Sequence, residues 1–250
     1  GYTWWYINYD TGADGWSVEE YLKKSVVVVP PPGGSTQIQE SIVINGVTRT
    51  YTVVVPTVLP TTPHPLAFYF HGGPSGANAP GNSGLITLVE NNGWFLVYPQ
   101  AQATTNNTWE SGSWGPTGST PFLGTNDFTL VETLINNLAA RYPINKAQVF
   151  GLGFSNGGHF VHRLACQRST LLRGVVSAGA SRSLAADQEG CPGTPLPFLI
   201  MNGTAEEDSS PYNCATPTTG CMTRGGPFIG AVQTAEKWAA INGCPIISVD

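Results

Sequence analysis

Charged residues are scarce in this sequence of 250 residues, and positive charge is the scarcer sign. Lys, Arg, Asp and Glu together make up 11% of the chain, with 11 basic against 16 acidic residues and a formal net charge of −5. Nucleic-acid binding needs a basic surface that neutralises phosphates, so this balance excludes a nucleic-acid partner. The sequence also lacks an apolar run of the roughly 20 residues that a membrane-spanning helix requires. We therefore expect a soluble protein that has no membrane partner.

Uncharged polar residues take the place of charge, together with 30 glycines and 20 prolines. A polar, turn-rich surface of this kind is typical of secreted proteins. Apolar residues still make up 41% of the chain, which is enough for a sizeable core. The length predicts one domain. We place this domain at residues 36–250 and expect a monomer, with residues 1–35 forming an N-terminal extension that ends in a Pro/Gly-rich linker.

None of the five cysteines has the Cys-x-x-Cys spacing that is typical of metal ligands, which favours disulfides. Cys214 and Cys221 lie close together in one loop, so they form the first predicted pair. Cys166 with Cys191 is the second predicted pair, which leaves Cys244 without a partner.

Strand and helix patterns alternate along the chain from residue 37 onward. The first two predicted strands are joined by Asn45-Gly46, a dipeptide favoured in two-residue β-hairpin turns. Predicted strands cover 38–44, 47–55, 65–70, 94–98, 149–154, 175–178, 198–201 and 246–249, and predicted helices cover 85–91, 127–142, 157–167 and 231–242. This alternation predicts an α/β fold with a mainly parallel sheet and helices on both faces.

The most informative motif is the segment GLGFSNGG at 151–158, which contains Gly-x-Ser-x-Gly. It lies between a predicted strand and a predicted helix, the context of a nucleophile elbow. A turn this sharp leaves no room for a Cβ at Gly153 and Gly157, and it exposes the Ser155 hydroxyl at the helix N-terminus. The positive end of the helix dipole favours a developing oxyanion there. We therefore predict that Ser155 is a catalytic nucleophile.

An acyl-transfer site also needs N–H donors for the tetrahedral oxyanion. The elbow supplies one donor, the backbone N–H of Asn156. The segment His71-Gly72-Gly73 follows an early predicted strand and is placed to supply the other. We predict Gly73 as this second donor, because the next residue, Pro74, has no N–H.

Candidates for the catalytic acid follow the predicted strand 198–201. Glu206, Glu207 and Asp208 lie there, in agreement with an acid that comes after the nucleophile in the chain. In this order of catalytic residues along the chain, the histidine that acts as base is expected after the acid. All four histidines of the sequence precede these carboxylates. They are His64, His71, His159 and His162.

Three of these histidines have positions that favour structural roles. His71 adjoins the predicted oxyanion loop, where such a residue is usually structural. His159 and His162 lie in the helix that follows the nucleophile. Together with Cys166 they have spacing compatible with zinc, but we favour core packing and a disulfide and predict no metal site.

Several segments between about Thr48 and Cys244 together resemble the secreted polyhydroxybutyrate depolymerase / feruloyl and acetyl-xylan esterase family. The most specific of them is the elbow, FSNGG at 154–158, with RLAC at 163–166. The others are RTY at 49–51, VP at 55–56, PL at 65–66, HG at 71–72, VYPQ at 97–100, Trp114, DF at 127–128, ARYP at 140–143, NGTA at 202–205, PY at 211–212, WAA at 238–240 and NGC at 242–244.

The resemblance implies an α/β-hydrolase fold with Ser155 as nucleophile, Asn156 and Gly73 as oxyanion hole, and no cofactor. The family's acid follows the Gly-Thr-Ala segment directly, and Glu206 stands at that position. Asp208 is the only aspartate nearby, so both carboxylates are candidates.

Members of the family continue past the segment 242–244 with a further strand and a loop that carries the catalytic His. The sequence ends at Asp250 before such a loop. We therefore expect an α/β hydrolase that lacks its C-terminal strand and His loop, which would also account for the unpaired Cys244.

We predict a secreted carboxylic ester hydrolase that works through an acyl-serine intermediate on plant polysaccharide esters or polyhydroxyalkanoate. Its partner would be an ester-bearing polymer or its oligomers, with a feruloyl, acetyl or hydroxyalkanoate acyl group. Trp109 and Trp114 lie in the loop before the helix at 127 and are candidates for a substrate wall. The alternative is a non-catalytic relative that binds polysaccharide or polyester. A secreted protease with the same elbow is a third hypothesis that no sequence feature favours.

Overall fold

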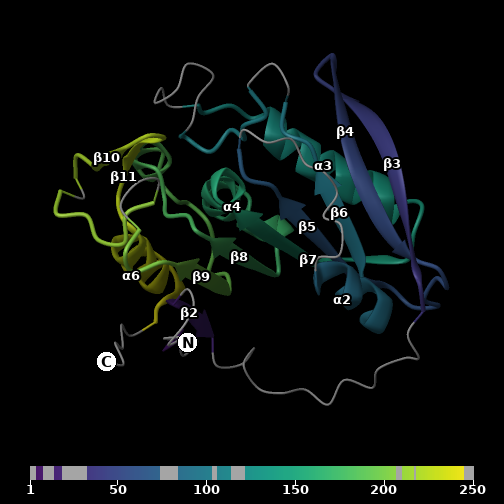
Figure 1. The fold of residues 1–250 in the computed structure, drawn as a ribbon. Helices are drawn as coiled ribbons and strands as arrows, with labels where there is room; N and C mark the ends of the chain where they lie inside the picture. Colours follow the sequence, from purple (N-terminus) through teal and green to yellow (C-terminus); the bar gives the residue numbers. More distant parts are fainter. Residues whose placement is uncertain are drawn as a thin grey trace.

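The computed structural model describes residues 4–7, 14–18, 33–73, 84–102, 106–113, 122–206, 210–216 and 218–244. Its centre is a nine-stranded sheet (Figure 1). The strands of this sheet are β1 (Trp4–Ile7), β2 (Asp14–Val18), β3 (Ser35–Ile44), β4 (Val47–Pro56), β5 (His64–Phe70), β6 (Phe95–Pro99), β7 (Ile144–Phe154), β8 (Gly174–Ala178) and β9 (Phe198–Asn202).

The helices are α2 (Gly84–Asn92), α3 (Asn126–Ala139), α4 (Asn156–Gln167), α5 (Leu184–Gln188) and α6 (Ala231–Asn242), with a short 3-10 helix η2 (Ser169–Leu171). A second, two-stranded sheet pairs β10 (Cys221–Thr223) with β11 (Gly226–Phe228). Within the described ranges, no helix has both the length and the apolar character needed to cross a bilayer.

The main sheet follows the spatial order β1-β2-β9-β8-β7-β5-β6-β4-β3. Strands β6, β5, β7, β8 and β9 run parallel to one another, whereas β4 and β3 join antiparallel at the side of β6. The carboxyl ends of the parallel strands therefore meet at one edge of the sheet, the edge where ligands bind in sheets of this type.

The β3–β4 hairpin confirms the turn predicted from Asn45-Gly46. Asn45 has φ 49° and Gly46 has φ 81°, so both central residues adopt the left-handed conformation that a type I′ turn requires. The hairpin has a continuous register from Ser35 opposite Pro56 to Ile44 opposite Val47.

Alternate residues of the central strands face two separate cores, as the period of a β-strand requires. Phe68 and Val97 face the larger core, which α3, α4 and α6 cover. Ala67 and Leu96 face a smaller core, where they pack with Val89 of α2. The sheet therefore has helices on both faces, as the alternation of the sequence predicts.

Three predicted boundaries differ from the structure by three or more residues. The first strand, predicted from Ile38, begins at Ser35. The helix predicted to reach Tyr142 ends at Ala139, because the residue before Pro143 is disfavoured in a helical conformation. The strand predicted from Val149 begins at Ile144, which already pairs with His64 of β5. The strand predicted at 246–249 lies outside the described residues.

Two segments of the predicted N-terminal extension belong to the main sheet. Strand β2 pairs antiparallel with β9, with Gly15 opposite Met201 and Trp16 opposite Ile200, and β1 pairs with β2. Backbone groups at the edge of β9 are therefore paired with the start of the chain.

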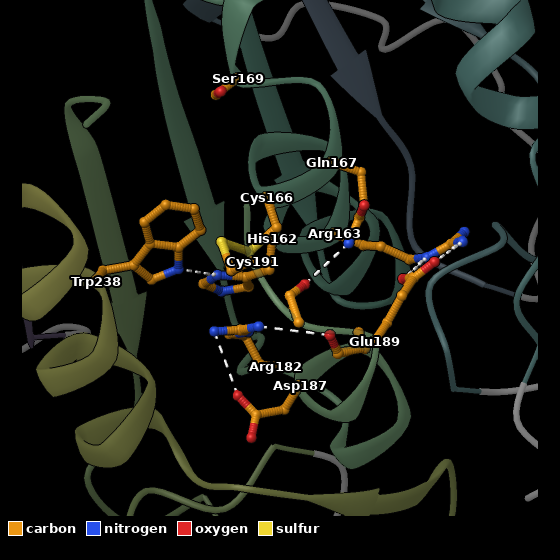
Figure 2. Close-up of a disulfide and its surroundings, with 12 residues drawn as sticks. His162, Arg163, Cys166, Gln167, Ser169, Arg182, Asp187, Glu189, Cys191 and Trp238 are labelled. Atoms are coloured by element: carbon orange, nitrogen blue, oxygen red, sulfur yellow. Dashed lines mark hydrogen bonds and ion pairs between the residues drawn. A yellow bond between two sulfur atoms is a disulfide. The ribbon is translucent and has the colours of Figure 1, made fainter. Parts of the chain in front are cut away.

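Both predicted disulfides are present, and Cys244 is half-buried, with its Sγ 3.8 Å from Asn242 O. The bond between Cys166 and Cys191 joins the last turn of α4 to the segment after α5 (Figure 2). The bond between Cys214 and Cys221 closes a local loop that leads into β10.

Removal of the α4 disulfide by Cys166→Ser with Cys191→Ser is expected to lower the free energy of unfolding by about 3 kcal/mol. The two residues are 25 positions apart, and a cross-link over a loop of this length removes entropy from the unfolded chain. Thermal unfolding should show a loss of several degrees in Tm. The single variant Cys244→Ser is the matched control, and a comparable loss in that variant would contradict the prediction.

Candidate active site

Ser155 lies at a sharp turn between β7 and α4, as the elbow motif predicts. Its backbone has φ 51° and ψ −121°, a combination that residues with a side chain rarely adopt. The Ser155 N–H donates to Ala178 O at 2.9 Å, and its carbonyl accepts from His159 N–H at 3.0 Å. The Ser155 side chain does not cap α4, so its hydroxyl is not consumed by the helix terminus.

The glycines around Ser155 are required by close backbone contacts. A Cβ on Gly153 would overlap the carbonyl of Gly157, and a Cβ on Gly157 would overlap the carbonyl of Phe70. On Gly158 a Cβ would lie 2.7 Å from Ala180 Cβ. The first turn of α4 therefore packs directly on the backbone of β5 and β7, which confirms the reason given for glycines in this motif.

The predicted oxyanion loop lies against the elbow. A Cβ on Gly72 would lie 3.2 Å from Ser155 Cβ, and a Cβ on Gly73 would lie 3.4 Å from Asn156 Cβ. The structure thus brings the end of β5 beside Ser155 and the first residue of α4. These two backbone segments carry the predicted oxyanion donors, the N–H groups of Gly73 and Asn156.

The Asn156 side chain ties the elbow to a neighbouring loop, an interaction that the sequence analysis missed. Its Oδ1 accepts from Trp109 N–H at 2.7 Å, and its Nδ2 donates to Ser111 Oγ at 3.2 Å. Asn156 is buried, so these bonds satisfy both ends of its amide away from water. No periodicity or sequence motif predicts a contact between Asn156 and residues this far away in the chain.

The prediction that Trp109 forms a substrate wall is wrong, because its side chain is 0% exposed. The indole stacks on Phe160 with ring centroids 5.4 Å apart and meets Phe70 edge to face at 5.2 Å. Its Nε1–H donates to His71 O at 2.9 Å. Trp109 therefore supports the segment His71–Gly73, the predicted oxyanion loop, from within the core. Trp114 lies outside the described residues.

His71 has a structural role, as its position in the sequence indicates. Its Nδ1 lies 2.7 Å from Gly72 O, and its Nε2 accepts from Ala101 N–H at 3.1 Å. Both ring nitrogens are thus bonded to backbone. Burial lowers the pKa of His71, which keeps the imidazole neutral.

The two histidines of α4 are buried and bonded to the segment after β8. His159 Nδ1 lies 2.7 Å from Ser181 O, and His162 Nε2 lies 3.2 Å from Ala180 O. His162 Nδ1 also accepts from Trp238 Nε1–H at 3.1 Å (Figure 2). These contacts confirm core packing. Across the described ranges, no group of three His, Cys, Asp or Glu is placed to hold a metal ion.

None of the four imidazoles is positioned as a base for Ser155. His64 is the fourth, and it lies at the amino end of β5, whereas Ser155 follows the carboxyl end of the parallel strand β7. The other three are held by the backbone contacts just described. None of the four histidines therefore has a ring nitrogen placed to serve Ser155 as a base.

The candidate acids follow β9, whose carboxyl end lies at the same edge of the sheet as Ser155. Glu206 is half-buried in this loop, where its N–H donates to Gly203 O at 3.1 Å and its carbonyl accepts from Tyr212 N–H at 3.0 Å. Asp208 lies outside the described residues. The choice between the two carboxylates therefore stays open.

Arg163 is a further buried anchor of α4 that the sequence analysis did not identify. Its guanidinium pairs with both carboxylate oxygens of Glu189, at 2.7 and 2.8 Å (Figure 2). Its Nη1 also donates to the carbonyls of Glu110 at 2.6 Å and Gly124 at 2.8 Å. One cation thus links α4 to residues 106–113 (the Trp109 loop), to Gly124 before α3 and to Glu189 after α5.

A buried carboxylate pair lies next to this anchor. Glu110 N–H donates to Asp127 Oδ2 at 2.8 Å, and Asp127 N–H donates to Glu110 Oε2 at 2.9 Å. Asp127 also forms a buried ion pair with Arg49 at 2.7 Å. Burial raises the pKa of both carboxyl groups. These groups join the start of α3 to the Trp109 loop and to β4.

The strand order, its parallel centre and the strained serine between β7 and α4 define an α/β-hydrolase fold.

No known protein-family model matches the chain. Its curated relatives are esterases. A putative esterase, NocK, of Nocardia uniformis subsp. tsuyamanensis is 28% identical over 218 residues, which cover 84% of this chain and 61% of that protein.

A probable feruloyl esterase C of Aspergillus flavus is 31% identical over 121 residues, which cover 47% of this chain and 36% of that protein. The chain spans less than two thirds of either relative. Among solved structures, an S-formylglutathione hydrolase (FrmB) of Staphylococcus aureus aligns with a TM-score of 0.48 at 15% identity and covers 61% of each chain. The sequence relatives confirm the predicted resemblance to feruloyl and related esterases.

Gly153→Ala is expected to destabilise the fold by about 3 kcal/mol or more, because the new Cβ would overlap the Gly157 carbonyl. Gly151→Ala is the matched control on the same strand, since the nearest atom to its Cβ would be Val175 Cγ1 at 3.4 Å, an ordinary contact. Urea unfolding of both variants measures the difference. Equal losses in the two variants would show that the close approach of α4 is not the reason for Gly153.

The stability contributed by the buried neutral His159 is expected to be lost as the pH is lowered from about 6.5 towards 4. Burial lowers the pKa of His159 to about 4, whereas an unfolded histidine has a pKa near 6.5. Between these values the unfolded chain binds a proton that the folded chain excludes, so the contribution is complete above pH 6.5 and lost on acidification. Burial of His162 acts in the same direction.

His159→Gln should reduce this dependence by up to about 1.4 kcal/mol per pH unit. The free energy of unfolding in urea, measured at several values between pH 4.5 and 7, gives the slope for both proteins. Other buried groups such as Glu110 contribute equally to both slopes and cancel in the comparison. The prediction fails if the variant keeps the slope of the parent chain.

Proposed function

We propose that this chain carries the nucleophile and oxyanion hole of a serine carboxylic ester hydrolase. The observation that carries the proposal is the strained backbone of Ser155, with φ 51°, at the start of α4 and beside Gly72 and Gly73. Backbone strain persists where the surroundings enforce it, and it clusters at active sites. The esterase relatives support the same class of reaction.

In the proposed reaction, Ser155 Oγ attacks the carbonyl carbon of the ester while its proton passes to a base. The negative charge that develops on the carbonyl oxygen is held by the backbone N–H groups of Asn156 and Gly73. Collapse of this intermediate breaks the bond to the alcohol, which leaves with a proton, and an acyl-serine forms. Water then attacks the acyl-serine, releases the carboxylic acid and regenerates Ser155.

The base of this reaction is a histidine that the printed sequence does not contain. This part of the proposal depends on the occupied ring nitrogens of His71 and His162, on the burial of His159 and on the remote position of His64. Glu206 or Asp208 would orient that histidine from the loop after β9.

The proposed substrates are esters of plant polysaccharides or of polyhydroxyalkanoate, with a feruloyl, acetyl or hydroxyalkanoate acyl group. A feruloyl group has support in the names of the relatives. The protein would act outside the cell as a monomer on the polymer or its oligomers. Two disulfides favour an oxidising compartment.

A binding protein with the same fold is the second candidate function. The absence of an imidazole beside Ser155 in the printed sequence favours it, because a serine without a base has little nucleophilic power at neutral pH. Such a protein would retain an ester-bearing polymer without turning it over.

Imidazole rescue separates the two functions. Hydrolysis of p-nitrophenyl acetate, butyrate and ferulate is measured for the chain and for Ser155→Ala, with and without added imidazole. We expect slow turnover without imidazole, and with imidazole an increase that is larger for the parent chain than for Ser155→Ala. Free imidazole would restore part of the roughly 10²–10⁴-fold that a positioned base contributes, and Ser155→Ala corrects for hydrolysis by imidazole itself.

Fast turnover without imidazole that is lost in Ser155→Ala would contradict the proposal that the base is missing from the sequence. His71 would then be the first residue to test as the base. Equal rates for both proteins in every condition would contradict the esterase and favour the binding protein.

A further inference from the structure

Phe154, the residue before the nucleophile, is exposed in a chain that otherwise buries most of its phenylalanines. Its side chain is 52% exposed, whereas Phe68, Phe70, Phe95 and Phe160 are fully buried. It ends β7, at the carboxyl edge of the parallel strands. An exposed ring at this position has an unfavourable contact with water, which a ligand would remove.

Two glycines frame the Phe154 ring. A Cβ on Gly72 would lie 3.3 Å from Phe154 Cδ1 and 3.2 Å from Ser155 Cβ. On the other side, a Cβ on Gly179 would lie 3.6 Å from Phe154 Cε2. Cδ1 and Cε2 are opposite corners of the ring, so the ring spans the space between the end of β5 and the turn after β8. Side chains at either glycine would crowd it.

The ring is also next to the reacting atoms of the proposed site. Gly72 belongs to the oxyanion loop, and the same Cβ position on Gly72 would touch both the Phe154 ring and Ser155. A group joined to an ester carbonyl at Ser155 therefore lies within reach of the exposed ring. Ligands of parallel sheets bind at this edge.

We propose that Phe154 is a specificity-determining residue whose ring forms an apolar wall for the group attached to the ester carbonyl. This inference rests on the proposed function, because it assumes that an ester binds at Ser155. A flat, conjugated or aromatic group gains most from the wall, since an aromatic ring adds a stacking contribution to the burial of apolar area. An acetyl group is too small to cover the ring.

The test measures equilibrium binding, which needs neither nucleophile nor base. Methyl ferulate and methyl acetate are titrated into the Ser155→Ala protein, and then into the double variants Ser155→Ala/Phe154→Ala and Ser155→Ala/Phe154→Leu. Calorimetry or ligand-observed NMR gives Kd. Ser155→Ala/Val43→Ala is the matched control, because Val43 is 63% exposed on β3, at the far side of the sheet from β7.

We expect Ser155→Ala to bind methyl ferulate, Phe154→Ala to weaken that binding about tenfold, and Phe154→Leu to weaken it less, because a leucine keeps apolar area but loses the stacking. Val43→Ala should leave Kd unchanged, and methyl acetate should bind too weakly to discriminate the variants.

Equal Kd values for the parent and Phe154→Ala, or no binding of methyl ferulate to Ser155→Ala, would overturn the inference. A second polypeptide segment that covers the ring would then account for its exposure. This binding result can be told apart from a failure of the esterase proposal. The esterase proposal fails if the turnover of p-nitrophenyl esters does not depend on Ser155.

Discussion

The close approach of α4 to the backbone of β5 and β7 is the constraint on which the candidate site depends. Gly153, Gly157 and Gly158 leave no side chain between the helix and the strands. The turn can then hold Ser155 at φ 51°, a conformation that costs on the order of 1–3 kcal/mol. Every residue of α4 except Gln167 is buried, and this burial offsets the cost. The strained conformation of Ser155 therefore persists because the whole helix is anchored in the core.

The same helix gathers the loops around the nucleophile. Asn156 binds the Trp109 loop, Arg163 binds Glu189 and two backbone carbonyls, and Cys166 is bonded to Cys191. The ion pair between Arg163 and Glu189 contributes little net stability, because desolvation of the buried Arg163 opposes the attraction between the charges. The contacts of Asn156, Arg163 and Cys166 instead fix geometry, since each of them holds one loop in one position relative to Ser155.

The sequence was sufficient for the parts of the fold that local rules decide. Strand and helix periods predict the order of elements, and Gly-x-Ser-x-Gly predicts the turn at Ser155 with its physical reason. Long-range contacts were not predictable in this way, because the burial of Trp109 and the bonds of Asn156 depend on segments far apart in the chain. Trp109 was assigned to a substrate wall from its position in a loop, but a large indole with a bonded N–H also fits a core.

The histidines show why a nucleophile and a base have to be considered separately. A base for Ser155 must accept a proton near neutral pH, and an imidazole does so well when its pKa is close to that pH. Burial lowers the pKa of His159 to about 4 and lowers that of His71, because a charged ring would be cut off from water. The same buried surroundings that hold the elbow in place therefore make these imidazoles poor proton acceptors near neutral pH. In the proposed reaction, the histidine would approach Ser155 from the carboxyl edge of the sheet, the edge at which the exposed Phe154 ends β7.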